Sequence, residues 1–192
     1  DASEPPIVDG SARPFTTLIH QCGVVEQAAN REVFTLTQPI TINEGSRSII
    51  ALPFDGLRIT CTSADDRGIH TQHLTTDIDP ESYVAQIAPA RTFGFRDQVE
   101  ALLQAGLIRG GALDNALVCD GDSWLNPPLR FAEEPVRHKL LDLIGDLALV
   151  GLPQAQVFAY RGSHGLHTAL AAAIQAGSPD PALSSAPRTP AP

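Results

Sequence analysis

The segment 135–150 constrains the fold more than any other part of this sequence. On a helical wheel of about 100° per residue its apolar side chains cover most of the circumference, so we expect a helix that is buried nearly all round. Within residues 138–150, four ionisable residues interrupt the apolar surface, namely His138, Lys139, Asp142 and Asp146, and all four fall on one arc of about 100°. Because a buried carboxylate needs a cation, a metal or several donors, this arc is the first candidate for a functional site.

Composition limits the classes of protein to be considered. The chain has 192 residues, 43% of them apolar, which is enough for one domain or for one domain with part of a second. A formal net charge of -9 argues against a general nucleic-acid binder and against a polybasic membrane anchor. No apolar run reaches the roughly 18 residues of a membrane helix. The three cysteines are far apart with no CxxC pair, which is typical of free thiols in a reducing cytoplasm.

Hydrophobic spacing and turn residues predict the remaining elements. We expect helices over 15–30, 79–87, 97–105 and 166–176, and strands within 32–62 and at 91–95, 116–119 and 157–160. Asp79 before Pro80 is a typical helix start, and 63–73 are expected to form a polar loop. The Pro-, Ser- and Ala-rich tail 177–192 is expected to be disordered. Strand runs separated by helices, without strict alternation, predict an α+β fold.

His138 and Asp142 are the candidate metal pair. They are four residues apart, so both side chains can reach one point beside the helix. An imidazole nitrogen with a carboxylate oxygen suits Zn²⁺. The alternative is a His, Lys and Asp ion-pair network at a helix packing surface, which spacing alone favours. A metal site also needs at least one further ligand, and spacing does not identify it.

Two other residues are candidates for catalysis. His164 lies in the small-residue loop 161–165 (RGSHG), where an imidazole can donate a proton or stabilise an anion, although an ordinary loop histidine is the alternative. Thr92 can donate its hydroxyl to a developing oxyanion, although most such threonines are structural. The remaining histidines carry less weight as ligands: His70, His73, His20 and His167.

Several motifs occur in order, and their combination is specific. They are DGSA at 9–12, ARTFGF at 90–95, GGALDNA at 110–116, RHKLLDLIGDL at 137–147 and SH at 163–164. The chain resembles the UDP-3-O-acyl-N-acetylglucosamine deacetylases, the zinc amidases of lipid A synthesis, over residues 5–176. The resemblance implies hydrolysis of the N-acetyl group of a UDP-linked acylated glucosamine in the cytoplasm, the committed step of lipid A biosynthesis, with zinc as the cofactor.

The resemblance assigns the metal site in part. His138 and Asp142 match two zinc ligands, and Thr92 matches a hydroxyl that helps to polarise the amide carbonyl. The family's third ligand and its general base form a Glu-His pair upstream of the DGSA motif. No Glu-His dipeptide occurs in this sequence, and it contains no Met. We therefore expect a truncated chain that binds zinc more weakly than a complete enzyme does, and the sequence leaves the activity of this chain alone open.

The resemblance also assigns a substrate site. Lys139 matches a substrate-binding lysine, His164 matches the histidine that stabilises charge or protonates the leaving amine, and Asp146 matches the carboxylate that orients this histidine. Segment 93–118 resembles a β-α-β insert that forms an apolar passage for the acyl chain. Its candidate lining residues, for which plain core packing is the alternative, are Phe93, Val99, Ile108, Leu113 and Val118.

The family fold has two layered α+β domains with the site between them. By this resemblance, residues 1–30 are the end of the first domain, 31–176 are the second domain with its insert, and 177–192 are a tail. Two alternative functions remain. One is a non-catalytic module that keeps the acyl-chain and nucleotide-sugar contacts, and the other is a remnant without a stable fold.

Overall fold

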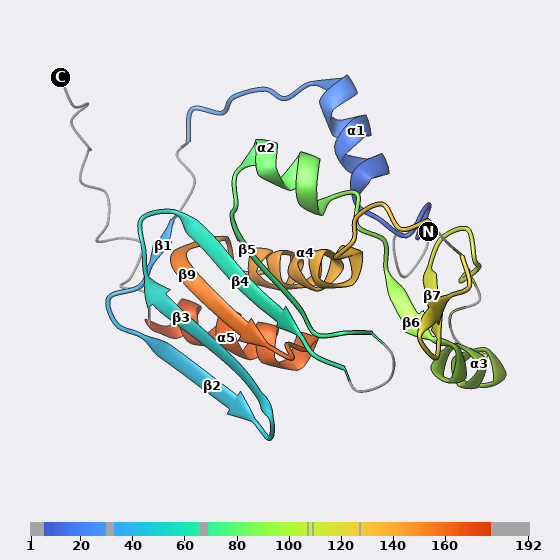
Figure 1. Ribbon diagram of the computed structural model, residues 1–192. Coiled ribbons are helices and arrows are strands. Elements are labelled where there is room, and N and C mark those ends of the chain that lie inside the picture. The colour runs from blue at the N-terminus through green and yellow to red at the C-terminus, as the bar shows by residue number, and fades with distance from the viewer. Residues whose placement is uncertain are drawn as a thin grey trace.

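A large mixed sheet with two helices on one face forms the body of the molecule (Figure 1). The computed structural model describes residues 6–29, 33–65, 69–106, 108, 110–126 and 128–177. The strands are β1 (Phe34–Thr35), β2 (Ile40–Glu44), β3 (Arg47–Pro53), β4 (Leu57–Ser63), β5 (Gln72–Asp77) and β9 (Pro153–Tyr160). Their order is β2-β3-β9-β4-β5, and β1 pairs with β9. The last long strand, β9, is parallel to β4 and antiparallel to β3, and the α+β class is confirmed.

The two covering helices bury the main core. Helix α4 (Glu134–Ala148) packs on β4 and β5, and α5 (His164–Gly177) packs on β2 and β3. Fully buried members of this core include Ile49, Ile59, Leu140, Leu143, Leu147, Val157 and Leu170. Each such side chain stabilises the fold by about 1.5–3 kcal/mol relative to exposure. The helix expected at 135–150 is thus present, although Leu149, just beyond its end, is 74% exposed.

A second, smaller sheet lies beside the large one (Figure 1). It consists of β6 (Phe93–Phe95), β7 (Leu117–Asp120) and β8 (Ser123–Trp124), with α3 (Arg96–Gln104) between the first two strands. The strands β6 and β7 are parallel, so β6, α3 and β7 form the expected β-α-β unit. It has its own core of Ile69, Phe95 and Cys119.

The first helix is shorter than its hydrophobic spacing predicts. Helix α1 covers Arg13–Cys22, with Pro14 in its first turn, and the backbone leaves it at Gly23 with φ +77°. That conformation favours glycine and ends the helix before 30. None of the α1 residues is buried.

The helix expected over 79–87 is present but changes type. It begins as α2 (Pro80–Ser82) and continues as a π-helical turn over Tyr83–Ile87. The cap prediction is confirmed, because Asp79 Oδ1 accepts a hydrogen bond from Ser82 N at 2.8 Å.

The polar loop expected over 63–73 ends early. Strand β5 begins at Gln72 and forms an edge of the large sheet. Its residues alternate between half-buried and exposed, and Leu74 is its sole apolar side chain, so hydrophobic alternation gives almost no signal. No helix in the described part of the chain is long and apolar enough to cross a membrane. Residues 178–192 of the expected disordered tail lie outside the described ranges.

Candidate active site

The side chain of His138 is held so that one ring nitrogen faces Asp142. Its Nδ1 lies 3.0 Å from the carbonyl oxygen of Ala90. A carbonyl oxygen only accepts, so Nδ1 carries the proton and the lone pair is on Nε2. Burial lowers the pKa of His138, although the negative charge of Asp142 raises it in part. The lowered pKa favours the neutral imidazole, which is the form that binds metals.

The spacing of His138 and Asp142 fits a tetrahedral metal. The distance from His138 Nε2 to Asp142 Oδ1 is 3.5 Å. Two ligand atoms at zinc bond lengths and the tetrahedral angle are about 3.4 Å apart. The other carboxylate oxygen, Oδ2, accepts a hydrogen bond from Lys139 Nζ at 3.0 Å. The geometry is compatible with two ligands of one metal ion, and Ala90 O and Lys139 Nζ are partners of the kind that orient ligands in such sites.

A second group lies one helical turn along α4. Asp146, His164 and His167 offer ligand atoms within 4.8 Å of one another, a spacing compatible with a metal ion. However, Nδ1 of His164 and Nδ1 of His167 lie 2.7 and 2.8 Å from the same oxygen, Oδ2 of Asp146. These distances are shorter than the separation of about 3.4 Å expected for two ligands of one zinc ion. They are those of two N–H groups donating to one carboxylate oxygen.

A buried carboxylate fixes the segment that carries Thr92. The side chain of Glu134 is inaccessible and accepts hydrogen bonds from Arg91 N and Nε, at 2.9 and 2.8 Å, and from Arg130 N at 2.6 Å. Burial alone would raise the pKa of Glu134, but the hydrogen bonds from Arg91 and Arg130 hold it below its usual range. The adjacent Thr92 N donates to Gly10 O at 2.7 Å. A side chain at Gly10 would collide with the backbone of Asn115, so the DGSA turn requires glycine there.

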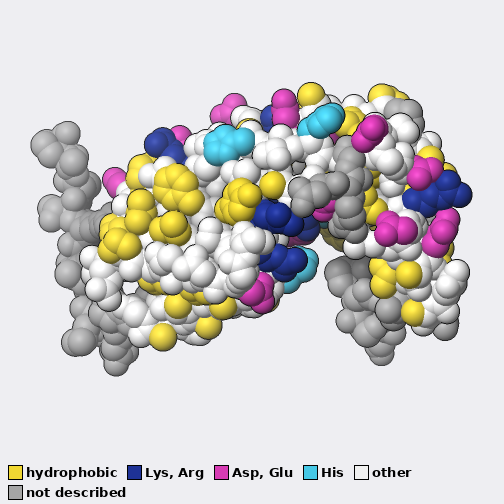
Figure 2. Space-filling view, turned by 60° about the horizontal axis from the view of Figure 1, so that its bottom comes forward, with side chains coloured by type: hydrophobic (Ala, Val, Ile, Leu, Met, Phe, Trp, Pro, Cys, Tyr) yellow, Lys and Arg dark blue, Asp and Glu magenta, His cyan; other side chains and the backbone are white. Residues whose placement is uncertain are grey.

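A cavity of about 240 Å³ opens beside this site between the two sheets. Phe93 and Lys139 line it, together with Cys61 and Arg161. The Lys139 ammonium lies 5.5 Å from the centre of the Phe93 ring, a cation–π contact. Figure 2 shows basic side chains gathered beside the hollow between the two parts of the molecule.

The other candidates for the acyl passage do not line this cavity. Val118 is a buried residue of β7 in the small sheet, whereas Ile108 and Leu113 are 39% and 53% exposed. Val99 lies against Gly94 on the helix side of β6. Of the five candidates, the structure therefore brings only Phe93 to the wall that Lys139 shares.

The chain matches a single family model over most of its length. The model for UDP-3-O-acyl N-acetylglycosamine deacetylase (LpxC) covers residues 1–176. The chain belongs to this family. Proteins of that name from Thermosynechococcus vestitus, Nostoc sp. and Synechocystis sp. are 51%, 45% and 47% identical to it over 173, 184 and 175 residues. These alignments cover 89%, 92% and 89% of this chain but only 60%, 65% and 63% of the relatives, so the chain spans about three fifths of their length.

The candidate site contains contacts that the motifs did not reveal. The carbonyl of Ala90 holds His138 and the second histidine, His167, holds Asp146, whereas the carboxylate of Glu134 holds Arg91, the neighbour of Thr92. His167 follows His164 by three residues at the start of a helix, a spacing that puts both side chains on one face. Backbone carbonyls leave no trace in a sequence pattern.

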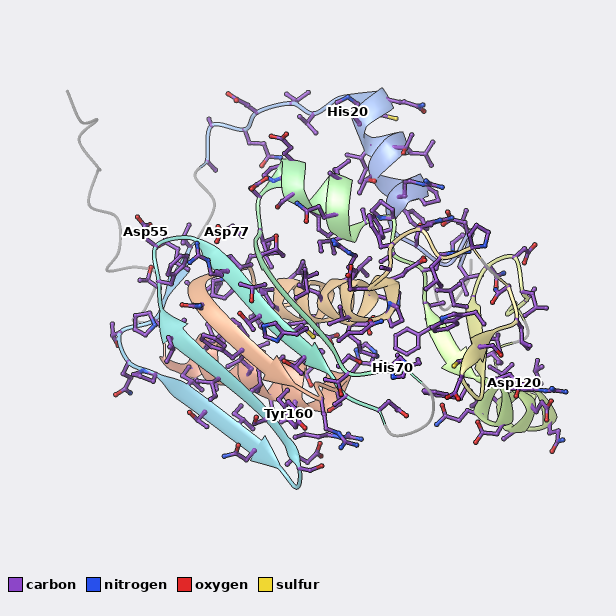
Figure 3. The ribbon with its side chains drawn as sticks, viewed as in Figure 1. His20, Asp55, His70, Asp77, Asp120 and Tyr160 are labelled. Carbon is purple, nitrogen blue, oxygen red and sulfur yellow. The ribbon has the colours of Figure 1, made fainter. Side chains whose placement is uncertain are left out.

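The other histidines lie apart from these contacts. His73 Nδ1 pairs with Thr62 Oγ1 at 2.9 Å. Figure 3 places His20 on α1 and His70 in the connection near the small sheet, while Asp55 and Asp77 lie at the opposite end of the large sheet.

Proposed function

We propose that this chain carries the second-domain half of the active site of a zinc-dependent deacetylase that acts on UDP-3-O-acyl-N-acetylglucosamine in the cytoplasm, at the committed step of lipid A biosynthesis. The observation that carries the proposal is the His138–Asp142 pair at a separation of 3.5 Å, with the His138 tautomer fixed by Ala90. Family membership over residues 1–176 supports the same reaction.

We assign Nε2 of His138 and Oδ1 of Asp142 as two zinc ligands. When bound, zinc polarises the acetamide carbonyl and lowers the pKa of a bound water. The resemblance gives the third ligand and the general base to a Glu-His pair, and no dipeptide in this sequence matches it. The proposed reaction needs those two groups in addition to the residues described.

Lys139 and Thr92 bind and polarise the substrate in this proposal. The ammonium of Lys139 faces the Phe93 ring in the cavity that both residues line. In this proposal Lys139 supplies a positive charge for the nucleotide phosphates, and Phe93 supplies an apolar surface for the acylated sugar. Thr92 is held by its backbone to Gly10 and Leu117. Its hydroxyl can therefore donate to the carbonyl oxygen as negative charge develops there.

His164 delivers a proton to the departing glucosamine nitrogen. Its side chain is 69% exposed, and Asp146 holds its Nδ1. Because Nδ1 donates to Asp146, Nε2 is the ring nitrogen left to carry the proton that is transferred. Asp146 thus acts through His164 as a positioning residue.

The test is an acetate-release assay with two proteins side by side. One is the protein as its gene encodes it, and the other is the 192-residue chain. The gene product should release acetate from the UDP-linked substrate, lose this activity to a chelator and regain it with zinc, whereas the chain should bind zinc more weakly and turn over far less. Failure of the zinc-loaded gene product to release acetate would refute the proposal. Substrate binding without acetate release would favour the non-catalytic module.

A further inference from the structure

Two histidines share one oxygen of Asp146. Nδ1 of His164 lies 2.7 Å and Nδ1 of His167 lies 2.8 Å from Oδ2, and the two rings meet edge to face with centroids 6.1 Å apart. An ionised carboxylate accepts only, so each histidine donates its Nδ1 proton. The two side chains differ sharply in exposure, at 69% for His164 and 2% for His167.

The loop before α5 is shaped to admit the His167 ring. A Cβ atom on Gly162 would stand 2.5 Å from Nε2 of His167, a distance no side chain tolerates. The backbone of His167 is fixed as well, because its N–H donates to Ser163 O at 2.9 Å. This enclosed ring is therefore a built feature of the fold, and the reaction proposed above leaves it without a role.

We infer that His167 is a positioning residue that shares the Asp146 carboxylate with His164 and so limits how strongly that carboxylate binds the Nδ1–H of His164. The inference rests on the proposed function for its catalytic meaning, but the hydrogen-bond arrangement stands without it. His167 touches neither the expected substrate nor the metal pair. It acts through Asp146.

The charges around His167 favour a neutral donor. Burial lowers the pKa of His167, and the neighbouring His164 lowers it further. The hydrogen bond with Asp146 and the charge of Asp142 act in the opposite direction and raise this pKa. Strands β2 and β3 pack against α5 through uncharged core residues, among them Ile42 and Ile49. A buried neutral imidazole donates one hydrogen bond and brings no charge.

The consequence concerns the hydrogen bond between His164 and Asp146. A carboxylate oxygen already accepting a hydrogen bond from His167 is a weaker partner for a second donor. Removing the first donor concentrates the attraction of Asp146 on His164. Removal of the His167 donor should therefore move the His164 titration measured by NMR to higher pH.

Three variants of the full 192-residue chain separate positioning from packing. His167→Phe keeps a flat ring and removes the donor, whereas His167→Asn places an amide N–H where Nδ1 was and keeps it. Leu170→Ala is the matched control, because it opens the core on the same helix, where Leu170 is fully buried, without touching Asp146. Each His164 titration is followed by side-chain ¹H–¹⁵N NMR, with and without zinc.

The expected result is an upward shift of the His164 titration in His167→Phe, a titration close to the original in His167→Asn, and no shift in Leu170→Ala despite its lower stability. Equal titrations in the Phe and Asn variants would overturn the inference. The unmodified chain provides a test that depends on no variant: His167 should show the neutral Nδ1–H form between about pH 6 and 8, and an Nε2–H form there would also overturn it. Because NMR needs no turnover, these outcomes are independent of the acetate assay.

Discussion

The carbonyl oxygen of Ala90 lies 3.0 Å from Nδ1 of His138, and this contact determines which imidazole nitrogen faces Asp142. The two residues are 48 positions apart in the chain and belong to different motifs. The contact joins the ARTFGF and RHKLLDLIGDL segments, since the backbone of the first sets the tautomer of His138 in the second.

Replacing His138 by alanine should remove the metal site. The expected result is a loss of zinc affinity of at least about 100-fold, since a ligand contributes more than the residues that orient it. Any acetate release by the gene product should fall to background. Zinc titration with a competing chelator measures the first effect, and His20→Ala, on exposed α1, is the control. Near-normal turnover in His138→Ala would disprove the ligand assignment.

Glu134→Gln should destabilise the fold. The neutral amide cannot compensate the positive charge of the Arg91 guanidinium, which is 12% exposed beside the fully buried side chain of residue 134. Breaking a buried ion pair costs about 3 kcal/mol of folding free energy. Urea unfolding at pH 7 measures the loss. The exposed pair Arg96–Glu100 gives the control, because Glu100→Gln should leave the unfolding free energy unchanged.

Acid should erase the difference between the Glu134→Gln variant and the parent. The folded-state pKa of Glu134 lies below its ordinary 4.5, so the ionised carboxylate stabilises the fold fully above that pH and progressively less as the pH falls through the folded value. Unfolding curves at pH 7, 5 and 3 should therefore converge toward low pH. A constant difference over this range would contradict the role of the charge.

The sequence predicts α4 well because its signal is local and strong. Apolar residues on most of its circumference, the four ionisable residues of 138–150 on one arc and Gly151 after its end together define one buried helix. Strand β5 was missed for the opposite reason, since an edge strand with a single apolar residue, Leu74, is stabilised by backbone pairing with β4 rather than by its own pattern.

The same distinction applies to the candidate site, where residues on one helix are predictable from the sequence and contacts between distant segments are not. His138, Asp142 and Asp146 are predictable because helical spacing places them together, and the structure keeps them on one side of α4. Two further contacts depend on how distant segments pack together. They are the one between His138 and the carbonyl oxygen of Ala90 and the one between Asp146 and the second histidine, His167. The reason for glycine at position 162 of the histidine loop is likewise seen only in the structure, where a side chain there would collide with the His167 ring.

The cysteines should differ in reactivity by burial. Burial raises the pKa of Cys61 to about 12, and it also raises the pKa of Cys119, whereas Cys22 is exposed. At pH 8 only about one Cys61 thiol in ten thousand is ionised, and the thiolate is the reactive form. Ellman's reagent should therefore label one thiol at once, and two more only after denaturation. Rapid labelling of two or three thiols in the folded chain would contradict this burial.

Two glycine substitutions should have opposite effects on stability. Gly162→Ala places a Cβ 2.5 Å from Nε2 of His167, so the imidazole must leave Asp146 or the loop must move, at about 1–3 kcal/mol. Gly145→Ala, on the exposed side of α4 with nothing within 4 Å, should instead stabilise the helix by about 1 kcal/mol. Urea unfolding of both variants gives the comparison, and NMR of the His167 ring shows whether its bond to Asp146 is lost in the first. If Gly162→Ala were as stable as the parent with the His167 bond intact, the close fit between the loop and the ring would be wrong.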